Sequence, residues 1–313
     1  MHHVSDQASR AGQTTDHVLM IRPVRFGYNA QTAESNAFQH APDALSPEQI
    51  QAQALAEFDT FVGMLRAAGV QVTVFEDTPD PHTPDSIFPN NWISTHAGGQ
   101  VFVYPMQAPN RQAERREDII HWALGRYEHG HLTDLTTMAG GTFLEGTGSM
   151  ILDRTHGVIY ACLSPRTDPV LLEQFARQLQ YKTVVFEAAD ARGQAIYHTN
   201  VMMALGQSLA VVCLGAVTRA TDRDTLVDSL ETSGYAILDI SLEQMEQFAG
   251  NMLEVRSQQD GQQHMVLSRR AWDSLSSAQR DLLSHFTVPL VIPLDVIETY
   301  GGGSVRCMMA EIF

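Results

Sequence analysis

The sequence predicts an α/β fold in which five similar helix-and-strand units close into a ring. Three observations favour this fold. A helix pattern, a strand and a hairpin follow one another in a fixed order, and the helices recur about every 55 residues, a period typical of arrays and propellers. The strand expected at 18–21 can also complete the last unit. We expect residues 17–313 to form one domain, preceded by a flexible polar tail at 1–16.

The first unit shows why each element is expected. Ser46 is a typical helix cap, Pro47 suits the first helical position, and apolar residues continue at helical spacing until Gly69. A strand at 70–75 follows, and then a hairpin across Gly98-Gly99. The hairpin strands of this unit are expected at 92–95 and 101–104.

The other four units repeat this order, each with a glycine-marked turn or a chain end. Their expected elements are a helix through 119–124, a strand near 132 and a hairpin at 150–153 and 158–160; a helix at 171–179, a strand at 183–186 and a hairpin at 200–205 and 209–214; a helix through 226–230, a strand at 236–240 and a hairpin at 252–255 and 264–267; and a helix at 277–285, a strand at 288–292 and a terminal strand at Cys307.

Composition narrows the class of function. The chain has 44% hydrophobic and 18% charged residues, which is typical of a globular protein, and no apolar run is long enough to span a bilayer. Its formal net charge of −16 argues against a nucleic acid or a membrane as partner. Three widely spaced cysteines without a C-x-x-C pair, and no signal peptide, favour a reducing cytoplasm.

Cys307 is the candidate nucleophile. Gly301-Gly302-Gly303 precede it, and glycines allow positive φ and the close approach of a ligand to the backbone. The alternative is a buried cysteine on a C-terminal strand, because free cysteine is often buried. We interpret Cys162 and Cys213, which lie in apolar strands, as core residues.

Polar loops occupy the same place in successive units. In a ring, such loops point toward one axis, so residues far apart in sequence can meet there. The loops are Pro84-Asp85-Ser86-Ile87-Phe88-Pro89-Asn90-Asn91, Phe143-Leu144-Glu145-Gly146-Thr147-Gly148-Ser149, Tyr197-His198-Thr199-Asn200, Gly250-Asn251-Met252-Leu253-Glu254 and Gly301 to Cys307.

These motifs resemble those of the guanidine-modifying (pentein) superfamily, which includes arginine and agmatine deiminases and dimethylarginine hydrolases. Within it, the chain is most similar to the citrulline utilization hydrolase group. The resemblance implies a five-bladed α/β propeller, in agreement with the repeats. The motifs that carry it are Pro84-Asp85-x-x-Phe88-x-Asn90-Asn91, Leu144-Glu145-Gly146, His198-Thr199-Asn200 and Gly301-Gly302-Gly303-x-x-x-Cys307-Met308.

The resemblance and the chemistry assign the same three roles. A thiol needs help to become a thiolate at neutral pH, and His198 can accept its proton, protonate a leaving amine and activate water. Glu145 would orient the imidazole and favour its cationic form. Cys307, His198 and Glu145 are therefore the expected catalytic residues.

The expected substrate follows from a departure from the deiminases. Those enzymes hold a guanidinium between two aspartates, and this chain has Asn91 and Asn200 at the matching positions. A buried guanidinium without a carboxylate would be an unpaired charge, whereas an asparagine amide can both donate to and accept from a neutral ureido group. We therefore favour citrulline over arginine. The alternative is that both asparagines only hold turns.

The resemblance also implies further substrate contacts. Asp85 is the candidate for the α-amino group, Gly303 belongs to the glycine motif, and Ser149 replaces an acidic residue of the deiminase pocket. Arg25, Arg154 and Arg306 remain open as candidates for the α-carboxylate. Two loops, Thr78 to Pro84 and Asn29 to Ala44, are lid candidates by composition.

The expected reaction is hydrolysis of the ureido carbon–nitrogen bonds of citrulline, giving ornithine, carbon dioxide and ammonia. No metal or organic cofactor is expected, because the histidines and cysteines show no ligand spacing. The expected partner is a small ureido or guanidino amino acid, with a homodimer as candidate assembly. The alternatives are hydrolysis of arginine or dimethylarginine, and a non-catalytic propeller that binds a partner.

Overall fold

The computed structural model describes residues 12–33, 36, 38–39, 41 and 45–313. Within these ranges the chain forms five three-stranded sheets, and each has a central strand that is antiparallel to one neighbour and parallel to the other. In spatial order, the sheets are β15 (Ala310–Glu311), β1 (His17–Arg22) and β2 (Gln71–Glu76); β3 (Ile93–His96), β4 (Gln100–Val103) and β5 (His131–Asp134); β6 (Ile151–Asp153), β7 (Val158–Cys162) and β8 (Lys182–Phe186); β9 (Met203–Leu205), β10 (Leu209–Val212) and β11 (Ala236–Asp239); and β12 (Leu253–Arg256), β13 (Gln263–Ser268) and β14 (Val288–Ile292).

Helices connect the central strand of each sheet to its parallel partner, as a parallel pair requires a crossover. These are α1 (Pro47–Ala67), α3 (Glu117–Leu124), α5 (Pro169–Leu179), α7 (Ala220–Thr232), and the pair α9 (Arg269–Ser274) and α10 (Ser277–Phe286). The shorter helices are η1 (Pro89–Asn91), α2 (Pro109–Gln112), η2 (Leu135–Met138), α4 (Gly146–Ser149), α6 (Thr199–Met202), η3 (Leu214–Ala216), α8 (Leu242–Glu246) and α11 (Asp295–Gly301).

The repeating unit differs from the expected one in its starting point. The sequence pattern grouped each helix and strand with the hairpin that follows them. In the structure, that strand pairs with the preceding hairpin: β5, for example, pairs in parallel with β4. The strand β1 completes the ring in the same way, since it pairs with the terminal strand β15 and with β2.

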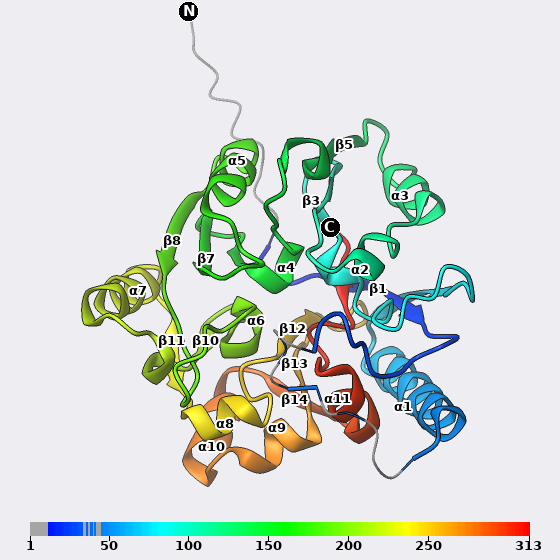
Figure 1. Ribbon diagram of the computed structural model, residues 1–313. Coiled ribbons are helices and arrows are strands. Elements are labelled where there is room, and N and C mark those ends of the chain that lie inside the picture. Colours follow the sequence, from blue (N-terminus) through cyan, green and yellow to red (C-terminus); the bar gives the residue numbers. More distant parts are fainter. Residues whose placement is uncertain (1–11, 34–35, 37, 40, 42–44) are drawn as a thin grey trace, which may run out of the picture.

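The connecting helices lie on the outside of the molecule, and α4 and α6 lie near its centre (Figure 1). The first strands of neighbouring sheets contact one another: β15 contacts β3, β6 contacts β9, and β9 contacts β12. Loops that enter these first strands therefore come together from several sheets.

Helix α1 illustrates how local sequence forms these elements. Ser46 and Gln49 make a capping box, and Pro47 occupies the first turn. The face carrying Phe58 and Phe61 is buried in one cluster with Val18 of β1. The expected cap and apolar stripe are both present.

The expected tail ends too late. Residues 1–11 lie outside the described residues, but Gln13 and Thr15 are buried. Gln13 donates a hydrogen bond to the carbonyl of Leu152 (2.9 Å) and accepts one from the backbone N–H of Arg154 (2.9 Å). These long-range contacts order a segment that composition alone indicated to be flexible.

The buried histidine His96 makes stability depend on pH. Its Nδ1 lies 3.0 Å from Arg154, and its Nε2 lies 2.8 Å from the Ser94 hydroxyl. Arginine can only donate, so Nδ1 must accept and the ring must be neutral. Burial lowers the pKa of His96 well below its ordinary value, and the charge of Arg154 lowers it further.

The free energy of unfolding is therefore expected to decrease as the pH falls below about 6.5, because His96 takes up a proton in the unfolded chain and not in the folded one. This residue contributes a slope of about 1.4 kcal/mol per pH unit, measurable by urea unfolding between about pH 7 and about pH 5. The slope should be smaller by that amount in His96→Gln and unchanged in His131→Gln, whose side chain is exposed. Equal slopes for the wild type and His96→Gln would contradict this account.

Candidate active site

The five polar loops occupy equivalent positions, just before the first strand of each sheet. Asn91 ends η1 two residues before β3, and Asn200 lies in α6 before β9. Asn251 precedes β12, and Cys307 precedes β15. The repeat thus places one polar or nucleophilic side chain from each of these four sheets near the centre.

Cys307 lies in a turn, not on the expected terminal strand, which begins at Ala310. Helix α11 ends at Gly301, and Gly302 turns the chain with a φ of 64°. A Cβ on Gly303 would approach the ring of Phe88 to 2.8 Å. Glycines are thus required here both for the turn and for close packing.

His198 and Glu145 form a buried pair. The Nε2 of His198 lies 2.7 Å from Oε2 of Glu145. Burial raises the pKa of Glu145, but the charge of Arg166 and the hydrogen bond with His198 outweigh it and lower the pKa to about 2. Glu145 is therefore ionised, so it accepts a proton-bearing Nε2 and leaves Nδ1 of the neutral ring as a proton acceptor.

The charge state of His198 is decided by its burial, which outweighs the effect of Glu145. Burial lowers the pKa of His198 to about 4, although the hydrogen bond and the charge of Glu145 raise it. The resting imidazole is therefore neutral near pH 7, not cationic. A neutral ring is suited to act first as a base.

Ser149 does not line the small cavity beside Cys307 that is described below. Its hydroxyl accepts the backbone N–H of Glu145 (2.9 Å) and donates to the carbonyl of Arg166 (2.7 Å). It joins the two loops that carry these side chains, so its hydroxyl is already occupied and the expected substrate contact is not supported.

Three buried polar atoms at the site have no hydrogen-bond partner among the described residues: Asp85 Oδ1, Asn91 Nδ2 and Asn200 Oδ1. The opposite atom of each side chain is engaged. Asp85 Oδ2 accepts from Asn29 (2.7 Å), Asn91 Oδ1 accepts from Arg111 (2.8 Å), and Asn200 Nδ2 lies 3.6 Å from the Cys307 sulfur. Burial raises the pKa of Asp85, which the charge of Arg111 opposes.

The site cavity is small, about 20 Å³, which is room for about one water molecule. Asp85, Asn91, His198, Gly303 and Cys307 line it, whereas Glu145 and Asn200 stand behind lining residues. The remaining lining residues are Thr32, Asn36, Phe88, Arg111, Arg166, Tyr197, Gly301 and Gly302. Thr32 and Asn36 belong to the segment expected as a lid, of which residues 34, 35, 37, 40 and 42–44 lie outside the described residues.

Arg111 and Arg166 were missed in the sequence analysis, and the three arginines named there do not line the cavity. Arg25 is exposed, Arg154 stacks on Phe313, and Arg306 contacts Glu311. Both cavity arginines follow the central strand of a sheet, Arg111 after β4 and Arg166 after β7. Comparing equivalent positions in the repeat could have indicated them.

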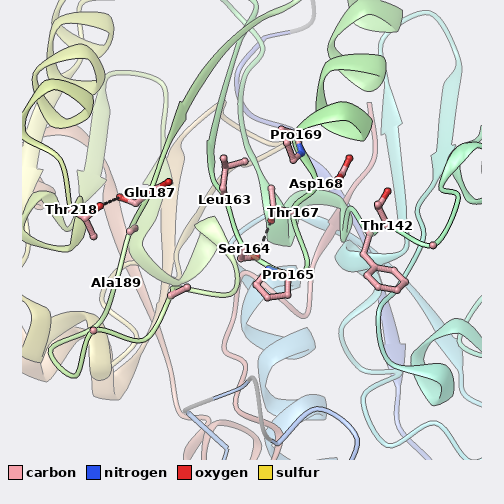
Figure 2. A pocket seen from close by; sticks show the side chains of 15 residues that line it. Thr142, Leu163, Ser164, Pro165, Thr167, Asp168, Pro169, Glu187, Ala189 and Thr218 are labelled. Carbon is pink, nitrogen blue, oxygen red and sulfur yellow. Dashed lines mark hydrogen bonds between the residues drawn. The ribbon is translucent and has the colours of Figure 1, made fainter.

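A larger cavity of about 610 Å³ lies between the loop 163–169 and the segment after β8. Figure 2 shows Ser164 and Thr167 facing Glu187 and Thr218 across it. No predicted site residue lines this cavity. Its size therefore does not outweigh the chemistry gathered in the smaller one.

The other two cysteines fit a structural role. Cys162 and Cys213 are fully buried among apolar residues, and burial raises the pKa of each thiol to about 11. Among the described residues, no group of three or more His, Cys, Asp and Glu side chains is arranged to hold a metal ion. Within the same ranges, no helix combines the length and apolarity needed to cross a membrane.

A family model described as N,N dimethylarginine dimethylhydrolase, eukaryotic, matches residues 22–313. No functionally curated protein is similar enough in sequence to be matched. Three solved structures show the same fold at low identity.

The apo structure of ArgZ, an arginine dihydrolase from the ornithine-ammonia cycle in cyanobacteria, has 16% identity and a TM-score of 0.73, and the match covers 94% of this chain. The chain spans only 40% of the length of that protein. The N-terminal domain of ArgZ bound to product has 16% identity and a TM-score of 0.73, with coverage of 95% of this chain and 97% of that domain. A dimethylarginine dimethylaminohydrolase variant with an S-methyl-L-thiocitrulline adduct has 15% identity and a TM-score of 0.64, with coverage of 95% and 99%.

Proposed function

The chain belongs to the N,N dimethylarginine dimethylhydrolase family of the pentein superfamily, and from that premise we propose that it hydrolyses the ureido carbon–nitrogen bonds of citrulline. The family acts on carbon–nitrogen bonds of guanidino compounds. The finer assignment to a ureido substrate rests on one observation. The three unpartnered polar atoms at the site offer one donor and two acceptors.

A bound citrulline molecule would satisfy all three atoms once the cavity, which has room for about one water, widens to admit it and exposes Asn200 behind the lining residues. Its ureido oxygen accepts from Asn91 Nδ2, its ureido NH₂ donates to Asn200 Oδ1, and its α-amino group donates to Asp85 Oδ1. Each of these atoms is buried, and leaving such an atom unpaired costs about 1–3 kcal/mol. The site is therefore complementary to a neutral group beside an amino acid head.

Arg111 determines which end of the Asn91 amide faces the substrate. It donates to Asn91 Oδ1, and it also donates to Glu114 and to the carbonyls of Asp85 and Phe88. The donor Nδ2 is thereby left for the substrate. A guanidinium, which only donates, would place N–H against N–H at this point.

The substrate carboxylate requires a cation, and Arg166 is the residue that we expect to bind it. It lines the cavity, and its guanidinium is held there by Glu145 (3.5 Å) and by the carbonyl of Thr32 (3.4 Å). We assign the α-carboxylate to Arg166, because a guanidinium fork suits a carboxylate.

The reaction proceeds through Cys307. Its thiol transfers a proton to neutral His198, and the sulfur attacks the ureido carbon. The tetrahedral intermediate collapses as the proton passes to the δ-nitrogen, which leaves as ornithine, and a thiocarbamate remains on Cys307. Water activated by His198 then cleaves the carbon–sulfur bond, and the released carbamate decomposes to carbon dioxide and ammonia.

The five sheets also support a finer description of the fold and its setting. We infer one closed five-bladed propeller that includes the residues from Gln13 onward, because β15 joins the first sheet, first strands of neighbouring sheets touch, and Gln13 bonds to Leu152 and Arg154. All three cysteines are free thiols, which suits a reducing cytoplasm. A homodimer stays a candidate assembly.

Turnover of citrulline, arginine, agmatine and dimethylarginine tests the proposal. We expect kcat/KM for citrulline to exceed that for arginine by at least about 100-fold, because an unmatched polar pair in a buried site discriminates strongly. Faster hydrolysis of arginine would overturn the assignment. Comparable rates on arginine and citrulline would overturn it in favour of an activity of the kind named for ArgZ, an arginine dihydrolase.

A further inference from the structure

The hydrogen bonds to the Cys307 sulfur come from side-chain amides. Among the described residues, Asn251 Nδ2 lies 3.3 Å from Sγ and Asn200 Nδ2 lies 3.6 Å from it. The imidazole of His198 makes its hydrogen bond to Glu145 instead. Asn251 is therefore the nearest donor to the reacting atom, although neither the catalytic trio nor the substrate contacts include it.

Backbone contacts fix the orientation of the Asn251 amide. Its Oδ1 accepts the backbone N–H of Arg306 (3.1 Å), and its Nδ2 donates to the carbonyl of Asn200 (2.9 Å). Rotating the amide by half a turn would set N–H against N–H and oxygen against oxygen. The first N–H of Nδ2 is used by Asn200, so the second is left for the sulfur.

The position of Asn251 suits a hydrogen bond to the Cys307 sulfur. Asn251 is 1% exposed and lies just before β12, while Cys307 holds the equivalent place before β15. A hydrogen bond to an ionised acceptor is roughly twice as strong as a neutral one, and burial limits competition from water. The Oδ1 of the same amide lies farther from the sulfur, at 3.7 Å, where it could accept a proton from the thiol. The shorter contact, at 3.3 Å, comes from the N–H, so the amide favours the thiolate over the thiol.

We propose that Asn251 is a further catalytic residue, which holds the Cys307 sulfur and stabilises its thiolate by an N–H hydrogen bond. This proposal rests on the proposed function only in taking Cys307 as the nucleophile. The charged and titratable groups around the sulfur are Asp85, Arg111, Arg166, Tyr197 and His198, which line the cavity, and Arg306 beside it in the chain.

The test follows thiolate formation without substrate. The ultraviolet absorbance of the thiolate is titrated with pH in the full chain, as the difference between each protein and its counterpart carrying Cys307→Ser. In Asn251→Asp, which keeps the shape and replaces the donor by an acceptor, we expect the midpoint to rise by about one pH unit or more. Asn251→Ala, which removes the donor without adding charge, should raise it by a smaller amount.

Asn90→Ala is the matched control. Asn90 is fully buried and bonds to Thr147 rather than to the sulfur, so its midpoint should equal that of the wild type. A wild-type midpoint in Asn251→Ala would overturn the proposal, and this variant decides the question if Asn251→Asp does not fold. Because no substrate is present, an absence of citrulline turnover would leave the result intact.

Discussion

Replacing Cys307 by serine is expected to reduce citrulline turnover by about 10⁴-fold or more, because a hydroxyl is a far weaker nucleophile than a thiol. The two side chains are similar in size, and the sulfur's neighbours are amide groups that can also bond to a hydroxyl. The fold should therefore persist. Steady-state kinetics and a thermal melt by circular dichroism measure the two quantities.

Cys162→Ser is the matched control for this prediction. Cys162 is equally free and fully buried, but it packs beneath α6 and donates to the carbonyl of Ile196. We expect this variant to lose stability and to keep turnover within a few-fold. If Cys162→Ser lost activity and Cys307→Ser kept it, Cys307 would not be the nucleophile.

Replacing Glu145 by glutamine is expected to reduce kcat by about 10³-fold or more, in the way that an amide in place of a triad carboxylate forces the wrong histidine tautomer. Glu145 accepts two N–H groups, from the backbone of Gln107 (2.8 Å) and from His198 Nε2 (2.7 Å). Glutamine has one acceptor and one donor. If its NH₂ faces the imidazole, Nε2 must become the acceptor and Nδ1 carries the proton, so the ring can no longer act as a base.

The buried Glu254 offers a control for the loss of a carboxylate. It accepts the backbone N–H of Gln207 (2.6 Å) and lies outside the site cavity. Glu254→Gln should keep kcat within about twofold, since no tautomer depends on it. Wild-type kcat in Glu145→Gln would remove the carboxylate from the mechanism.

Much of the fold could be predicted because the signals for its elements are local. The Ser46 cap, the apolar stripe of α1 and the glycine turn at 98–99 each specify an element within a few residues. The pairing of strands is different, because the parallel partner of a strand lies beyond a helix. The sequence therefore predicted the elements and assigned each hairpin to the wrong neighbour.

The segment at Asn200 shows how tertiary contacts change local structure. Its apolar pattern predicted a strand, but residues 199–202 form one helical turn. The Thr199 hydroxyl donates to the carbonyl of Ser149 (2.6 Å) and accepts the backbone N–H of Cys162 (2.9 Å). These partners come from another sheet and leave no local signal.

The site could be predicted where chemistry and position coincide. Equivalent loop positions, together with the motifs that resemble the pentein superfamily, led to Cys307, His198 and Glu145 before any distance was known. The buried Arg111 could not be recognised from its own residue type, because an arginine is usually exposed and its partner Asp85 lies 26 residues away; only its position after a central strand was a signal. The neutral state of His198 also required its burial, which only the structure gives.

The covalent intermediate provides the most direct test of the central claim that Cys307 attacks a neutral ureido carbon. Citrulline labelled with carbon-13 at the ureido position is mixed with the enzyme, and the reaction is stopped with acid within one turnover. The masses of the cysteine-containing peptides are then measured by mass spectrometry. The account predicts one labelled carbamoyl group on the peptide containing Cys307 and none on those containing Cys162 or Cys213. A citrulline-consuming enzyme whose Cys307 peptide never carries the label would contradict it.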